Sequence, residues 1–325
     1  MLKVGILGAG KIAEKMAATI TRMEDAQVVA VGARDLERAK EFAGRHKIPR
    51  AYGNYQDLAA DEEVELIYIA TPHSHHKEHA ILCLEAGKHV LCEKAFARTA
   101  KEAREMLAVA NEKKLLLTEA IWPRFMPMAK TLAQLREKEY VGKIWGLGAN
   151  LFYPVCDVER IQRPELAGGA LLDVGIYPLT FASIVFGDDI ADITTSAILS
   201  DTGVDVSNTM ILNYTDGRQA TLSSGVMGRS DRRGVLYCEN GFIEVENINN
   251  FECIKIFDND YHLIEQINAP EQISGYEYEV QSAAKAIREG VLECPEIPQS
   301  QIIHMMELMD TIRHKWGFWY PGEEK

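Results

Sequence analysis

Residues 3–13 read Lys-Val-Gly-Ile-Leu-Gly-Ala-Gly-Lys-Ile-Ala. A short apolar run ends there at Leu7 and an amphipathic segment follows, so the two glycines between them mark a strand-to-helix turn. Gly8 permits the tight turn, Gly10 lets a pyrophosphate approach the backbone, and Ala13 allows the helix to pack closely on the strand. Unpaired N–H groups at the start of the helix would hold the phosphates. The residues expected to contact a dinucleotide here are Gly8, Ala9, Gly10, Lys11 and Ile12.

The same letters also occur in ordinary tight turns, but the segments that follow favour the cofactor. Short apolar runs alternate with amphipathic segments, which is typical of an α/β fold with a doubly wound parallel sheet. We predict strands over residues 3–7, 28–32, 66–70, 89–92 and 115–118. Asp35 is expected to cap a helix that runs to about His46, Thr99 and Glu102 form a capping box, and Gly87 ends the helix before the fourth strand.

The pattern changes after Trp122-Pro123. We predict helices over 127–138 and 170–186, a strand over 143–152, and two late helices over 276–288 and 300–315. Between residues 192 and 265 the apolar residues alternate in period two, with turns at 215–217 and 239–241, which indicates hairpins in a large, mostly antiparallel open sheet. The expected domains are therefore 1–121, which binds the dinucleotide, and 122–325, an α+β domain for substrate binding and oligomerisation.

Composition limits the classes of partner. A chain of 325 residues is long enough for about two domains. Its net charge of −13 provides no broad electrostatic footprint for nucleic acid. Six cysteines without a C-x-x-C pair are typical of reduced thiols in the cytoplasm. We find no run of about 18 apolar residues that would span a bilayer, and the N-terminus does not resemble a cleavable signal peptide.

The end of the second predicted strand bears on the choice of cofactor. An acid at this position would accept hydrogen bonds from the ribose hydroxyls of NAD, but the position holds Ala33. Arg34 follows, and its guanidinium can pair with a 2′-phosphate and stack on adenine. The alternative is that Arg34 is a solvated loop residue and Asp35 serves the ribose. The sequence favours NADP and leaves NAD possible.

Four features resemble the glucose-fructose oxidoreductase, inositol dehydrogenase and rhizopine-catabolism (Gfo/Idh/MocA) family. They are the glycine turn, Ala70-Thr71-Pro72 with His76, Cys92-Glu93-Lys94, and Asp173 with Tyr177. Residues 118–125 and 168–178 are most similar to its dihydrodiol dehydrogenase and NADP-dependent aldose dehydrogenase branch.

The resemblance implies a Rossmann domain, a C-terminal α+β domain, and hydride transfer between NADP(H) and a secondary alcohol or carbonyl of a small sugar, polyol or trans-dihydrodiol. It also implies a homo-dimer or homo-tetramer that associates through the C-terminal sheet. Besides the glycine turn, Ala33 and Arg34, the residues it places at the cofactor are Thr71, Pro72, His73, His76, Glu93, Lys94, Trp122 and Arg124. One departure is Ala95, where the family usually has proline, so the geometry that aims Lys94 is less preset.

The reaction needs a proton carrier within hydrogen-bond reach of the substrate hydroxyl. Tyr177 is the expected carrier, Lys94 its electrostatic partner, and Asp173 the orienting group, with Lys94 as the direct acid/base in the alternative. Asp173 and Tyr177 are spaced to share one helix face, and Pro178 can kink that helix. The structural alternative is a core tyrosine and a surface acid.

Two further features have competing interpretations. His75 and His79 have zinc-ligand spacing, but no supporting cysteine or acid lies nearby in sequence, so we expect no metal and assign His76 to orienting its loop. Trp122 either stacks near the nicotinamide or a substrate ring, or fills the interior between domains. A non-catalytic dinucleotide-binding regulator or redox sensor remains the alternative function, and the set Lys94, Asp173 and Tyr177 argues against it.

Overall fold

A computed structural model describes residues 1–323, and its chain divides into two compact units. The first comprises Met1–Trp122 together with Gln272–Met306, and the second comprises Pro123–Glu271 together with the residues from Glu307 on. This division differs from the expected second domain over 122–325, because residues 272–306 return to the first unit. There the hydroxyls of Thr19 and Ser274 lie 2.8 Å apart. The periodicity of an amphipathic helix shows which face it buries but not which sheet it covers.

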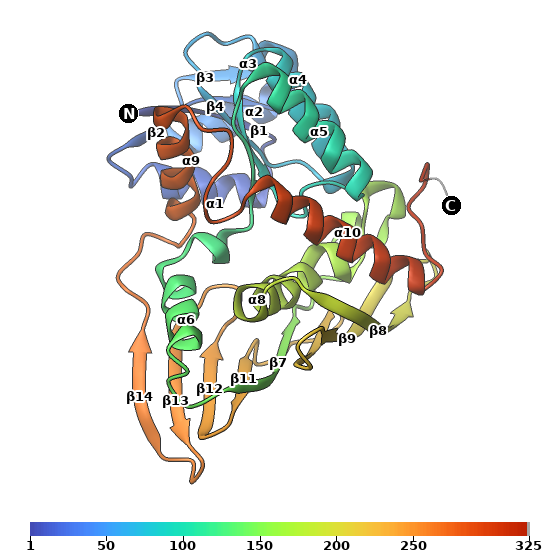
Figure 1. Cartoon of the computed structure of the whole chain (residues 1–325). Helices are drawn as coiled ribbons and strands as arrows, with labels where there is room; N and C mark the ends of the chain where they lie inside the picture. The colour runs from blue at the N-terminus through green and yellow to red at the C-terminus, as the bar shows by residue number, and fades with distance from the viewer. Residues whose placement is uncertain (324–325) are drawn as a thin grey trace. The chain divides into compact units, whose positions relative to one another are not determined.

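The first unit contains a parallel sheet in the order β3-β2-β1-β4-β5-β6, and Figure 1 labels its strands β1 to β4. Its strands are β1 (Leu2–Leu7), β2 (Ala26–Gly32), β3 (Arg50–Tyr52), β4 (Leu66–Ile69), β5 (His89–Glu93) and β6 (Leu117–Ala120). The order reverses beside β1, which places the carboxyl ends of β1 and β4 at the point where ligands bind in open sheets. The sequence pattern missed β3, and β6 begins two residues later than expected.

The helices of the first unit match the predicted boundaries closely where a helix was predicted, but the short helix over residues 55–59 was missed. They are α1 (Lys11–Ile20), α2 (Leu36–His46), α3 (Tyr55–Ala59), α4 (His76–Glu85), α5 (Ala100–Lys113), α9 (Glu277–Glu289) and the first part of α10 (Gln299–Lys315), with a 3₁₀ turn, η1, at His73–His75. Thr99 caps α5 by accepting a hydrogen bond from the N–H of Glu102 at 3.2 Å. The predicted capping box is incomplete, because the Glu102 carboxylate accepts from the N–H and the guanidinium of Arg98 instead.

The second unit contains a sheet in the order β14-β13-β12-β11-β7-β10-β9-β8, with β14 to β11 as a run of neighbouring arrows (Figure 1). Its strands are β7 (Ile144–Phe152), β8 (Ile190–Leu199), β9 (Asp205–Tyr214), β10 (Gln219–Gly225), β11 (Gly234–Cys238), β12 (Gly241–Glu246), β13 (Cys253–Asp258) and β14 (Leu263–Asn268). β7 and β10 pair in parallel, and the other paired neighbours are antiparallel. The predicted hairpin turns join β9 to β10 and β11 to β12.

Short helical segments cover one face of this sheet, where α8 contacts β7 and β10. They are η2 (Trp122–Phe125), which begins at the unit boundary, α6 (Pro127–Glu137), α7 (Glu159–Gln162), η3 (Pro164–Leu166), η4 (Leu171–Gly175) and α8 (Ile176–Phe186). The helix expected over 170–186 is thus divided: η4 is a π-helical turn and α8 is α-helical.

One segment has the length and composition of a membrane span, although Asp173 interrupts its apolar run. Residues Pro164–Phe186 form a 23-residue helical stretch with a sufficiently apolar window, of which 89% is buried inside the protein. The interior helix of a globular domain has the same composition, because it is enclosed by apolar side chains rather than by lipid. The segment is therefore weak support for a membrane span.

Candidate active site

The glycine turn between β1 and α1 has the geometry of a phosphate cradle. Gly8 has a φ of +103°, and a Cβ built there would lie 3.0 Å from the carbonyl oxygen of Ala70. A Cβ built on Gly10 would meet only that same oxygen, at 3.9 Å, so the described residues leave space in front of Gly10. Gly10 is also the N-cap of α1 and supplies no capping side chain, so the N–H groups of the helix start are available to an anion. The turn therefore fits a pyrophosphate.

The charged residues expected near this turn, Arg34 and Asp35, lie just before α2. Arg34 is exposed, as a residue that pairs with a ribose phosphate would be, whereas Ala33 is buried. One Asp35 oxygen caps α2 by accepting from the N–H groups of Glu37 and Arg38 at 2.7 and 3.3 Å. The Asp35 carboxylate thus caps a helix, whereas the alternative interpretation assigned it to the ribose.

Arg38 is a residue that sequence reasoning missed. Its guanidinium donates to the carbonyl oxygen of Ala9 at 3.1 Å, so it reaches the glycine turn from the first turn of α2. The contact joins residues 29 positions apart. No local pattern in the sequence marks this pair.

His76 is completely buried between the loops that follow β4 and β5. Its Nε2 lies 2.8 Å from the carbonyl oxygen of Thr71, and its Nδ1 lies 3.0 Å from that of Ala95. Burial lowers the pKa of the ring to about 4, and the neutral ring donates to one of these two carbonyl oxygens at a time. His76 thus links the Thr71-Pro72 loop to the segment that carries Lys94, which fits the orienting role.

His79 and His73 make further contacts around this loop, and the rings of His75 and His79, the pair with zinc-ligand spacing, have centroids 5.6 Å apart. His79 Nδ1 lies 2.9 Å from the Thr71 hydroxyl, and burial lowers the pKa of His79 to about 4. The rings of His73 and His76 meet edge to face, with centroids 5.6 Å apart.

The segment after β5 that contains Lys94 is held by several buried groups. Tyr68 donates a hydrogen bond to Oε1 of Glu93, and the Lys94 N–H donates to Oε2 of Glu93 at 3.2 Å. The Phe96 N–H donates to Oε1 of Glu119 at 2.9 Å. The Lys94–Ala95 peptide bond is cis. Hydrogen bonds on both sides of Ala95 thus restrain the backbone where the family usually has proline. Glu93, expected at the cofactor, has its carboxylate directed into this buried network.

Trp122 and Arg124, which were expected at the domain junction, contact different side chains. Trp122 stacks on Tyr276 within the first unit, with ring centroids 4.4 Å apart and planes 5° apart. Arg124, within the second unit, donates to the hydroxyl of Ser183 on α8 at 2.7 Å, and Ser183 donates to Asp188 at 2.6 Å.

Asp173 and Tyr177 lie on adjacent turns of the divided helix in the second unit. Asp173 is in the π turn η4, and Tyr177 is the second residue of α8, so the α-helical spacing used to place them on one face does not strictly apply. Both are buried. The guanidinium of Arg160 on α7 donates to Oδ1 of Asp173 at 2.7 Å. Sequence reasoning missed Arg160, because the four-residue helix α7 has no local motif.

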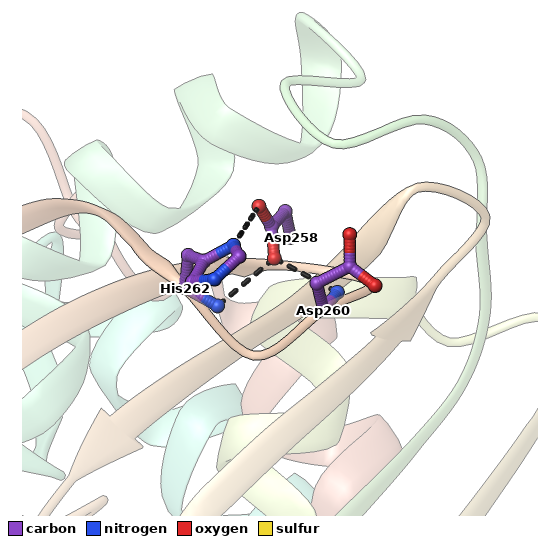
Figure 2. A group of neighbouring side chains, drawn as sticks. All are labelled: Asp258, Asp260 and His262. Carbon is purple, nitrogen blue, oxygen red and sulfur yellow. Dashed lines mark hydrogen bonds and ion pairs between the residues drawn. The ribbon is translucent and has the colours of Figure 1, made fainter.

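A different group of potential metal ligands lies at the β13–β14 turn. Asp258, Asp260 and His262 each offer one ligand atom within 4.8 Å of the others (Figure 2). Oδ1 of Asp258 accepts from the N–H groups of Asp260 and His262, both at 2.9 Å, and Oδ2 lies 3.1 Å from Nδ1 of His262. These bonds lower the pKa of the Asp258 carboxyl. They are typical of a tight turn, so the hairpin itself explains why the three residues lie close together.

Comparisons with known proteins extend over nearly the whole chain. The trans-1,2-dihydrobenzene-1,2-diol dehydrogenases of Xenopus tropicalis and Homo sapiens are 33% and 34% identical, and each comparison covers at least 98% of this chain and 99% of the relative. Among solved structures, a 3-ketoreductase from Actinomadura kijaniata has a TM-score of 0.88 at 24% identity, with 96% of this chain and 97% of that chain covered. An aldose-aldose oxidoreductase from Caulobacter crescentus has a TM-score of 0.87 at 20% identity, with 96% of each chain covered. These two show the same fold.

Two family models match the chain. The model described as an oxidoreductase family with an NAD-binding Rossmann fold matches residues 2–121, and the GFO/IDH/MocA C-terminal domain matches residues 129–244. The matches agree with the glycine turn, the parallel sheet and the second, mostly antiparallel sheet. The chain belongs to the Gfo/Idh/MocA family of oxidoreductases.

Proposed function

We propose that the protein is an NADP-dependent dehydrogenase or reductase that acts on a secondary alcohol, or the matching carbonyl, of a small sugar, polyol or trans-dihydrodiol. The observation that carries the proposal is the full-length similarity to dihydrodiol dehydrogenases, at about one residue in three. The open space at Gly10 and the presence of Lys94, Asp173 and Tyr177 in the same chain support it.

The proposed chemistry divides between cofactor and protein. The nicotinamide supplies the hydride acceptor or donor when it is bound. The Tyr177 hydroxyl exchanges a proton with the substrate oxygen, and the Lys94 ammonium stabilises negative charge on that phenol or on the substrate. In the alternative assignment, Nζ of Lys94 exchanges the proton directly. Asp173, paired with Arg160, orients the turn next to Tyr177.

A substrate screen tests the activity itself. Aldoses, inositols and aromatic trans-dihydrodiols are incubated with NADP, and formation of NADPH is followed by absorbance. We expect turnover with at least one class. Because proton transfer by a positioned group contributes about 10²- to 10⁴-fold, Lys94→Ala and Tyr177→Phe should each lower kcat by about that factor while binding NADPH normally. Full activity of either variant would remove that residue from the mechanism.

Cofactor choice is proposed to depend on Arg34 and Arg38. A guanidinium near the ribose pairs with the 2′-phosphate, which only NADP has. Arg34→Ala and Arg38→Ala should therefore raise the Kd for NADPH more than the Kd for NADH, as measured by fluorescence titration. Arg22→Ala, an arginine that contacts Ile273 instead, serves as the matched control. Equal or tighter NADH binding by the unmodified protein would overturn the NADP assignment.

We further propose that the protein forms a homo-dimer or homo-tetramer through the second sheet and resides in the cytoplasm. Trp145 on β7, Tyr237 on β11 and Ile198 on β8 expose 57%, 53% and 66% of their surface, which a second copy could cover. The six cysteines are free, and four of them are buried, as suits a reducing compartment. Light scattering of the purified protein and of Ile198→Arg tests the first point, and cell fractionation tests the second.

A further inference from the structure

The start of the π turn η4 is tied to a buried aspartate on the neighbouring sheet. Asp205, the first residue of β9, exposes 3% of its surface. Its Oδ2 accepts a hydrogen bond from the N–H of Leu171, the first residue of η4, at 2.9 Å. A Cβ on Gly169 would clash with Oδ1 of Asp205, so the glycine lets the carboxylate approach this chain. Asp205 thus satisfies a helix-start N–H that would otherwise lack an intrahelical partner.

Two more buried polar side chains extend this contact across the sheet. Nδ2 of Asn208 donates to Oδ2 of Asp205 at 2.7 Å, and Oδ1 of Asn208 accepts from the hydroxyl of Ser224 on β10 at 2.7 Å. Asn208 and Ser224 are directly paired in the β9–β10 ladder. A Cβ on Gly175, the last residue of η4, would lie 2.9 Å from the Ser224 hydroxyl oxygen. This row of three polar side chains therefore meets η4 at both ends, with Asp205 at its first residue and Ser224 against its last.

We propose that Asp205 is a positioning residue that, through Leu171 and with Asn208 and Ser224, fixes the turn carrying Asp173 and leading into Tyr177. This inference rests on the proposed function, because it takes Asp173 and Tyr177 as the groups that act on substrate. Asp205 itself does not act on substrate. Its hydrogen bonds set the backbone of η4, and a displacement of about 1 Å at a reacting group is enough to lower a rate about 100-fold.

The charge of Asp205 gives this arrangement a pH dependence. Burial raises the pKa of Asp205 to about 6, although hydrogen bonds from Asn208 and Leu171 oppose the rise. Above that pH the carboxylate accepts from both donors, and below it the protonated group is a weaker acceptor. The titration should therefore loosen η4 as the pH falls through about 6.

Other charged and titratable groups lie on the elements around Asp205. On η4 itself, Asp173 is paired with Arg160 from α7. From the C-terminal segment, the Tyr320 hydroxyl donates to the carbonyl oxygen of Gly168 at 2.8 Å, and burial raises the pKa of that phenol. The guanidinium of Arg313 lies over the Tyr320 ring, 4.6 Å from its centroid. Between pH 5 and 8 Tyr320 stays neutral and Arg313 stays positively charged, so neither produces a transition near pH 6.

Asp205→Asn tests the proposal in the full-length protein. An amide oxygen in the place of Oδ2 can still accept from Leu171 and Asn208, but it is uncharged, is a weaker acceptor than a carboxylate and does not titrate. We expect kcat to fall roughly 10- to 100-fold, with the Kd for NADPH unchanged, and the loss of kcat below pH 6 to disappear from the profile. Asp201→Asn, the same change at an exposed turn position four residues earlier, should leave kcat and its pH profile as in the unmodified protein.

Asn208→Ala provides a second measurement that does not depend on removing Asp205. It deletes a hydrogen bond that lowers the pKa of Asp205, so the acidic limb of kcat should move to higher pH. A purely structural role would lower the folded fraction without moving this limb.

The proposal is overturned if the limb stays in place in both variants, or if Asp205→Asn keeps normal kcat. An inactive Tyr177→Phe with a normal Asp205→Asn overturns this inference alone. A fully active Tyr177→Phe instead overturns the proposed function.

Discussion

Gly10→Ala should separate cofactor binding from folding. Gly10 has a φ of −99° and a ψ of −177°, which alanine adopts without strain, and the nearest heavy atom to a new Cβ is 3.9 Å away. A glycine-to-alanine change at a compatible position stabilises a protein by about 0.4–1 kcal/mol, because the unfolded chain loses conformational freedom. The free energy of unfolding is therefore expected to stay level or to rise slightly.

In contrast to the stability, the binding of NADPH should weaken. The new methyl group occupies the space in which the pyrophosphate would approach the helix start. Adding a methyl group to a well-packed contact costs about 1–3 kcal/mol. Since 1.4 kcal/mol corresponds to a factor of ten, the Kd for NADPH should rise about 5- to 150-fold. Fluorescence titration of NADPH measures this change, and urea unfolding without cofactor measures the stability.

Gly8→Ala is the matched control in the same turn. Its φ of +103° is unfavourable for alanine, and the Cβ would lie 3.0 Å from the carbonyl oxygen of Ala70 and 3.2 Å from Cγ2 of Thr71. We expect a loss of about 1–2 kcal/mol or more in stability, together with weaker binding. Binding of NADPH by Gly10→Ala within twofold of the unmodified protein would contradict a phosphate site at Gly10, and so would a loss of stability as large as that of Gly8→Ala.

Three other substitutions test buried charges. Burial and nearby carboxylates raise the pKa of Glu279 well above its usual value, and within residues 1–323 neither of its oxygens has a hydrogen-bond partner. The folded state then holds a proton that the unfolded state releases above about pH 4.5, so the free energy of unfolding declines as the pH rises. Glu279→Gln removes this titration, so in urea titrations its free energy of unfolding relative to that of the unmodified protein should be larger at pH 8 than at pH 5. An equal difference at both pH values would contradict this. Arg160→Gln removes the cation that pairs with the buried Asp173, so kcat should fall about 10- to 100-fold with little change in NADPH binding. An unchanged kcat would exclude an orienting role for the pair. Arg313 exposes 1% of its side chain and pairs with Glu323, so Arg313→Met should lower the free energy of unfolding by about 3–5 kcal/mol; a loss below 1 kcal/mol would show that the pair is dispensable.

Elements with strong local patterns were predicted well. The strands β1, β2, β4 and β5 are apolar runs that end at glycine or polar residues, so their ends could be placed to within about two residues. The strand β3 was missed because it has three residues, all only half-buried, and lacks an apolar run.

The candidate site was only partly predictable for a related reason. The glycine turn and the Cys92-Glu93-Lys94 segment are contiguous, so their residues could be found by motif. Arg38, Arg160 and Asp205 act on partners 29, 13 and 34 residues away, and no local pattern marks these pairs. The π geometry of η4 was also missed, because hydrophobic periodicity does not distinguish it from the α-helix that follows.

Local order along the chain was therefore sufficient to specify the parallel sheet apart from β3, the hairpins, the phosphate cradle at residues 8–13 and the segments that hold Lys94, Asp173 and Tyr177. Tertiary packing was needed to assign residues 272–306 to the first unit, to direct Glu93 into a buried network, and to place Asp205 under η4. The physical reason is that backbone conformation and amphipathic faces depend on neighbouring residues, whereas the partner of a buried polar group depends on which distant segment the folded chain brings to it.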